Sequence, residues 1–150
     1  MANPQGTYYA MAHTLTVSDQ GDFFQMRNTT GNRIEVLEIR VWQTSDTALA
    51  MNAIRIQRGV GGSGGNAVTE RSWDAGGKSV AATCFDTCTG DVGTLDLDIH
   101  CGWNILQEFV WLPTPEFYLI LQPSDHVGLS LLISDSLTMG ASMLWQEFGA

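Results

Sequence analysis

One group of residues in this sequence has the side-chain types that bind metal ions. It consists of Cys84, Cys88, His100 and Cys101. A structural zinc site of the Cys3His type needs two closely spaced pairs that converge on the ion. Cys84 and Cys88 could supply one pair. The other two residues are adjacent near a predicted strand end, where successive side chains point to opposite faces, so they would chelate one ion poorly. We therefore expect small buried side chains and no metal, with a disulfide as the alternative in an oxidising medium.

Two carboxylates, Asp96 and Asp98, are spaced to lie on one face of a predicted strand. Paired carboxylates can bind calcium, or they can act as the acid and base of a glycosidase. Asp86 and Asp91 are near in the sequence, but none of the four has the glycine-punctuated spacing of a calcium loop. A strand face exposed to solvent explains the pair more simply.

Motifs for other chemistries are incomplete. The three histidines are far apart in the sequence, and no G-x-S-x-G elbow is present. The glycine-rich segment 59–65 lacks the Lys-Ser or Lys-Thr and the helix that a phosphate-binding loop requires. The sequence therefore predicts a protein that is not an enzyme and that holds no cofactor.

Charge excludes one class of partner. The formal net charge is −9, and the only lysine is Lys78, whereas a surface that binds phosphates needs clustered Lys and Arg. We expect no direct contact with nucleic acid. The low charged content of 15%, with 16 glycines and 5 tryptophans, is typical of a β-protein that contacts other chains, although packing alone also produces this bias.

No targeting or membrane segment is visible in the sequence. The first six residues lack the basic and apolar regions of a secretory signal. The longest apolar runs have the length of strands, far below the roughly 20 residues of a membrane helix. We expect a protein that is folded in a cytoplasm and has no membrane partner.

The last third of the chain is the best defined part of the predicted fold. Its strands are predicted at 103–112, 117–122, 127–133 and 137–148. Prolines at 113, 115 and 123 end the first two, because proline removes a hydrogen-bond donor from the sheet. Strands at this spacing, with no helical pattern between them, indicate an antiparallel sandwich or barrel.

Two strands dominate the first half. Segment 7–17 alternates, with Tyr9, Met11, His13, Leu15 and Val17 on one face. Segment 33–43 also alternates, and we expect its core face to be the cleaner of the two, formed by residues 35, 37, 39 and 41. The whole pattern predicts an all-β protein with one antiparallel β-sandwich of the jelly-roll type and about eight to ten strands. Residues 1–6 are predicted to be a flexible arm, and residues 7–150 the single domain.

Landmarks between residues 33 and 149 resemble those of a known group of proteins. They are Gln43-Thr-Ser-Asp46, Ala53-Ile-Arg-Ile-Gln-Arg-Gly59, Trp103, Trp111-Leu-Pro-Thr-Pro-Glu116, Gly128-Leu-Ser-Leu131, Leu137-Thr-Met-Gly140, Gln146-Glu147 and Gly149. In these the chain resembles small virion-associated jelly-roll proteins of tailed bacteriophages. The group includes head decoration (cement) proteins, which commonly form trimers on the capsid surface, and tail or fibre components.

This resemblance implies a structural virion protein that binds the outer surface of a phage head and stabilises contacts between major capsid subunits. The implied partners are the major capsid protein and two further copies in a homotrimer. The implied location is the capsid surface, after assembly in the host cytoplasm. A receptor- or glycan-binding head of a tail or fibre is the alternative, and a small enzyme or sugar-binding protein of a non-viral cell is a third reading.

Candidate interface residues follow from the chain ends. The polar arm, with Asn3 and Pro4, could order on a neighbouring capsid subunit at an entropic cost. Met139, Met143, Trp145 and Phe148 are candidates for a face between subunits, because Met and aromatic residues are enriched there. Packing of these four in the core is the simpler alternative.

Overall fold

The computed structural model describes residues 4–17, 21–45, 51–74, 80–133 and 136–149. Twelve strands and one short 3-10 helix, η1, lie in these ranges. Their bounds are β1 Pro4–Val17, β2 Asp22–Asn28, β3 Arg33–Gln43, β4 Met51–Val60, β5 Asn66–Val68, β6 Glu70–Ser72, β7 Ala82–Asp86, β8 Gly93–Asn104, β9 Phe109–Trp111, η1 Pro115–Phe117, β10 Leu119–Leu121, β11 His126–Leu131 and β12 Leu137–Phe148.

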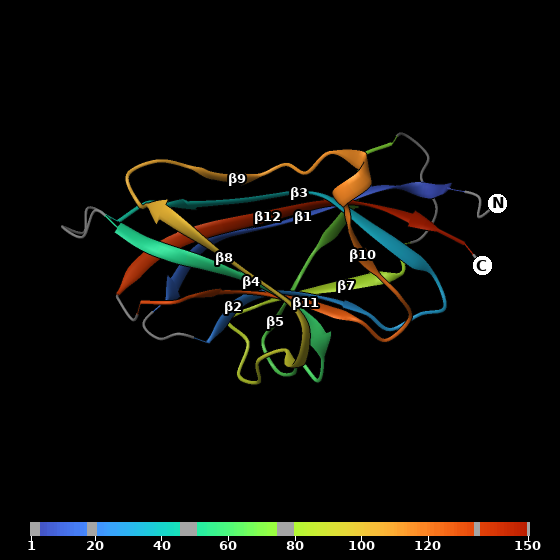
Figure 1. Cartoon of the computed structure of the whole chain (residues 1–150), viewed down its shortest axis with the longest axis horizontal. Coiled ribbons are helices and arrows are strands. Elements are labelled where there is room, and N and C mark those ends of the chain that lie inside the picture. The colour runs from blue at the N-terminus through green and yellow to red at the C-terminus, as the bar shows by residue number, and fades with distance from the viewer. Residues whose placement is uncertain (1–3, 18–20, 46–50, 75–79, 134–135, 150) are drawn as a thin grey trace.

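The strands form two antiparallel sheets that pack face to face (Figure 1). Sheet A has the order β10-β3-β12-β1-β6, and β9 also pairs with β3. Sheet B has the order β5-β7-β2-β11-β4-β8. No helix in the described ranges is long and apolar enough to cross a membrane.

The strand order is that of a jelly roll. The first four strands alternate between the sheets, so that β1 and β3 lie in sheet A while β2 and β4 lie in sheet B, and the last two strands do the same, with β11 in sheet B and β12 in sheet A. The central orders, β1-β12-β3-β10 and β2-β11-β4-β8, make the eight-strand double Greek key. The predicted all-β antiparallel sandwich is thus confirmed. The strand count is higher than the expected eight to ten because two short strands, β5 and β6, are added at the outer edges of sheets B and A.

The core lies between the sheets. From β12 it receives alternate residues of one face, Leu137, Met139, Ala141, Met143 and Trp145, which are all at most 1% exposed. Sheet B contributes side chains such as Phe24, Met26, Ile54, Ile56 and Leu129. Each such side chain stabilises the fold by roughly 1.5–3 kcal/mol through burial.

Two β-bulges change which residues face this core. In β1 the pairing with β12 shifts between Ala12 and Leu15, and Thr14 has a φ of 56°. Tyr9, Met11 and His13 therefore face outward, whereas Leu15 and Val17 are buried. The alternation predicted that all five residues share one face, and this prediction was wrong.

In β3 the shift falls at Leu37, because Val36 pairs with Trp145 while Glu38 pairs with Leu144. The core face is formed by Ile34 and Val36 before the bulge and by Ile39 and Val41 after it. The predicted core face was therefore right for residues 39 and 41 and wrong for residues 35 and 37.

The predicted flexible arm is also corrected. Pro4 and Gly6 belong to β1, where they pair with Phe148 and Glu147 of β12. Residues 4–6 are ordered because the C-terminal strand supplies backbone partners, which a local reading of the sequence does not reveal. Residues 1–3, and with them Asn3, lie outside the described residues.

The two predicted strands at 103–112 and 117–122 are each interrupted. β8 ends at Asn104 in a turn closed by a 2.9 Å hydrogen bond from Gln107 N–H to the Asn104 carbonyl, and β9 begins at Phe109. η1 covers Pro115–Phe117, so that only Leu119–Leu121 pair with β3. We call the segment 105–118, which contains β9 and η1, the strap.

Candidate functional site

The four candidate zinc ligands do not converge. Cys84 lies in β7 and Cys101 in β8, and three strands of sheet B separate β7 from β8. Among the described residues, no three His, Cys, Asp or Glu side chains are grouped so that they could hold a metal ion. All three cysteines are free thiols. Burial raises the pKa of Cys88 to about 11 and that of Cys84 well above its ordinary value, so both are protonated at neutral pH and are weak nucleophiles.

Asp96 and Asp98 form ion pairs with the neighbouring strand. Arg58 Nε lies 3.1 Å from Asp96 Oδ1, and Arg55 Nε lies 2.8 Å from Asp98 Oδ1. The hydrogen bond from Arg55 holds the pKa of Asp98 below its ordinary value. Both carboxylates are exposed, so the explanation of a solvated strand face is confirmed. Because each carboxylate is paired with an arginine, which favours the ionised form, neither is arranged as a general acid.

Two buried carboxylates escaped the sequence reading. Asp22, 1% exposed, accepts hydrogen bonds at Oδ2 from Gln25 Nε2 and Val92 N–H, both at 2.8 Å. Burial raises its pKa to about 6. The Asp22 carboxylate therefore has a structural role, because its hydrogen bond from the Val92 N–H attaches the loop at Val92 to β2.

Glu147 is fully buried at the far end of the sandwich. Its carboxylate accepts the N–H groups of Ala81 (2.9 Å to Oε2) and Ala82 (3.0 Å to Oε1), and the indole N–H of Trp145 (3.0 Å). It therefore links β12 of sheet A to the start of β7 in sheet B. Strict alternation along β12 puts Glu147 on the same face as Trp145, and this was the signal that could have found it.

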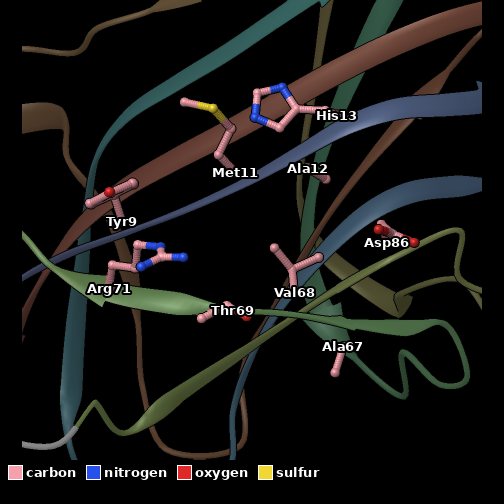
Figure 2. A pocket seen from close by; sticks show the side chains of 9 residues that line it. All are labelled: Tyr9, Met11, Ala12, His13, Ala67, Val68, Thr69, Arg71 and Asp86. Carbon is pink, nitrogen blue, oxygen red and sulfur yellow. The ribbon is translucent and has the colours of Figure 1, made fainter.

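A hollow of about 560 Å³ lies between β1 and the β5–β6 segment. Figure 2 shows Tyr9, Met11 and His13 along β1, with Arg71 on the neighbouring segment. Its one lining carboxylate, Asp86, accepts a hydrogen bond from Asn66 Nδ2 at 3.1 Å. The lining residues thus offer no second carboxylate for acid–base chemistry.

A larger hollow of about 680 Å³ lies on the outer face of sheet A, and we call it the aromatic groove. It is lined mainly by apolar side chains, with one charged cluster and a serine. The lining residues are Tyr9, Met11, Glu38, Arg40, Trp42, Trp73, Glu108, Ser142, Met143 and Leu144. This mixture of aromatic surface and a few convergent polar groups is typical of binding sites for small molecules.

The strap forms a separate apolar surface. Leu106, Leu112 and Phe117 are 69%, 68% and 75% exposed. Beside Phe117 a hollow of about 390 Å³ opens at the edge between the sheets, lined by Leu97, Ile99, Trp111, Pro113, Tyr118 and their neighbours. Large apolar side chains that are exposed beside such a hollow are candidates for contact with another molecule.

The predicted interface residues lie elsewhere. Met139, Met143 and Trp145 are at most 1% exposed, so these three are core residues, and the expectation that they face another subunit is corrected. Phe148 is half-buried with the Arg33 guanidinium 5.8 Å from its ring centre. Pro4 is paired in β1. Alternation alone cannot distinguish a core face from a subunit interface, because both are apolar.

We compared the sequence with known proteins. No protein-family model matches the chain, and a search of curated proteins found no significantly similar sequence.

Proposed function

We propose that this protein is a structural component of a phage virion, which decorates the outer surface of the capsid and stabilises contacts between major capsid subunits. The observation that carries the proposal is the exposed apolar strap at one edge of a jelly roll. Jelly rolls are common in viral capsid proteins. The resemblance of the landmark residues to those of virion-associated phage proteins also supports it.

The strap has the properties of a protein-binding surface. Phe117 and Leu112 present large apolar side chains to solvent, and burial of each against a partner is worth roughly 1.5–3 kcal/mol. Such anchors beside a hollow are the usual centres of binding energy at protein interfaces.

The edge that bears the strap is held in place. Arg40 and Ile39 of β3 pair with Val110 and Trp111 of β9. The Arg58 guanidinium of sheet B donates a 2.7 Å hydrogen bond to the Ile120 carbonyl in β10. Since β9 pairs with β3 in sheet A, and β10, which directly follows the strap, is hydrogen-bonded to sheet B, the segment need not lose much conformational freedom when it binds.

Co-sedimentation with empty shells of the same phage's major capsid protein tests the proposal. Wild-type protein should pellet with the shells. The double variant Leu112→Asp, Phe117→Asp should bind roughly tenfold more weakly or worse, because two charges would be buried at the contact. Thr29→Asp, which adds one such negative charge at an exposed site in the β2–β3 turn, is the control and should bind normally. Wild-type protein that stays in the supernatant would refute capsid decoration.

A further inference from the structure

We propose that the aromatic groove on the outer face of sheet A binds a neutral oligosaccharide. This goes beyond capsid decoration and uses a different surface from the apolar side chains of the strap. The proposal stands on the placement of two tryptophans and one charged cluster along the groove.

The first tryptophan lies flat on the sheet. A Cβ atom added at Gly140 would be 2.3 Å from Cε2 and 2.6 Å from Nε1 of Trp42, so the indole covers the bare backbone of the neighbouring strand. His13 packs against the indole at an interplanar angle of 61°, with the ring centres 6.0 Å apart. Trp42 also lines the groove, where its aromatic surface can stack on the apolar C–H face of a sugar ring.

The second tryptophan stands at the β6 side of the groove. Trp73 is 66% exposed, and its ring packs edge-on against Tyr9 with the centres 5.5 Å apart. Its backbone N–H donates a 2.7 Å hydrogen bond to the Thr7 carbonyl, which continues the pairing of β6 with β1. Both rings are therefore supported before any ligand arrives, and little ordering is needed on binding.

On the same strand as Trp42, the groove also holds a cluster of three charges. Arg40 donates hydrogen bonds to Glu38 at 2.6 Å (Nε to Oε1) and 3.2 Å (Nη2 to Oε2), and to Glu108 at 3.3 Å (Nη1 to Oε1). The carboxylates retain lone pairs that can accept hydrogen bonds from sugar hydroxyls, and the guanidinium has further N–H donors. Two negative charges against one positive charge disfavour an anionic ligand.

The same cluster argues against a protein as the occupant. The centres of protein interfaces are depleted of charged residues. Here Arg40 and Glu108 lie in the groove with 43% of each side chain exposed. Glu38 and Trp42 are four residues apart on β3, which separates their Cα atoms by roughly 13 Å along an extended strand. A chain of sugar rings can stack on the indole and still place hydroxyls against the charges along this length.

The test uses tryptophan fluorescence and calorimetric titration of the whole chain with maltohexaose, cellohexaose and chitohexaose, alongside an array of neutral and acidic glycans. We expect wild-type protein to bind at least one neutral glycan. Trp42→Ala and Trp73→Ala should each weaken that binding roughly tenfold or more. Phe117→Ala, which removes an exposed aromatic ring from the strap, should bind as wild type does.

Gly140→Ala provides a second variant that keeps every groove side chain. Its new methyl group occupies the place of the indole, so Trp42 must lift and sugar binding should fall, with circular dichroism confirming the fold. Three results would overturn the proposal. They are no binding of wild-type protein to any neutral glycan, equal loss in Phe117→Ala, and self-association in light scattering that Trp42→Ala abolishes.

Discussion

At the scale of single residues, Asp22 is the group whose protonation matters most. Burial raises its pKa from the ordinary 3.8 to about 6, even though two hydrogen-bond donors favour the charged form. A Cβ atom at Gly128 would be 2.3 Å from Asp22 Oδ2, so β11 packs directly on the carboxylate. The folded protein therefore binds this proton more tightly than the unfolded chain does.

The sign of the effect on stability follows from this difference. The contribution of Asp22 is complete below about pH 4 and is lost as the pH rises through 6, and it amounts to about 3 kcal/mol. Asp22→Asn keeps an oxygen for both donors and removes the charge. Urea unfolding should therefore show that the variant loses less free energy of unfolding between pH 4 and pH 7.5 than the wild type does.

Asp91→Asn is the control for that experiment. Its side chain accepts the Asp22 N–H at 2.8 Å, and its charge contributes to the raised pKa of Asp22. This variant lowers the folded-state pKa of Asp22, so its pH-dependent loss of stability should remain, be smaller than in the wild type and end at a lower pH. If Asp22→Asn retains the full pH dependence of the wild type, the assignment to Asp22 is wrong.

Glu147 is the second residue with a specific prediction. Glu147→Leu would leave the N–H groups of Ala81, Ala82 and Trp145 without their acceptor, and buried donors of this kind cost roughly 1–3 kcal/mol each. We expect a denaturant titration to show that the free energy of unfolding falls by about 3 kcal/mol or more. Glu147→Gln retains one acceptor oxygen and should lose clearly less. Equal stability of Glu147→Leu and the wild type would show that the buried carboxylate does not hold the sheets together.

At the scale of elements, the sequence predicts strands better than it predicts their faces. The alternation in segments 7–17 and 33–43 correctly identified strands, because period two is a local property. The bulges at Thr14 and Leu37 depend on how β1 and β3 pair with β12, which no local pattern contains. As a result Leu37 was placed on the wrong face, and the outward row of β1 was read as continuing into Leu15.

The pairing of the chain ends carries a prediction of its own. Removing residues 1–6 deletes the Pro4–Phe148 and Gly6–Glu147 pairs, so thermal or urea unfolding should show a loss of roughly 1–2 kcal/mol. A truncation of residues 1–3 alone is the comparison that isolates residues 4–6. If the longer truncation is as stable as the wild type, the sequence-based prediction of a flexible arm over residues 1–6 is supported instead.

At the scale of the whole molecule, the sandwich was predictable and its surfaces were not. Strand spacing and proline positions indicate a two-sheet protein. The strand order, however, decides that Cys84 and Cys101 lie at opposite sides of sheet B. It also brings Tyr9, Trp42 and Trp73 into one groove, although these residues are far apart in the sequence.

The exposed strap likewise follows from tertiary structure. The aromatic segment after residue 103 reads as one strand, yet only Phe109–Trp111 pair with β3 in sheet A. Ile105 is buried in the core, whereas Leu106, Leu112 and Phe117 are left on the surface.

Cryo-electron microscopy of capsid shells mixed with the protein tests the central proposal most directly. We predict added density for one β-sandwich per copy on the outer surface of the shell, in three-fold clusters as the resemblance to decoration proteins implies. The strap, with Leu112 and Phe117, should face the shell. Shells without added density, or copies attached with the strap turned to solvent, would contradict capsid decoration through this surface.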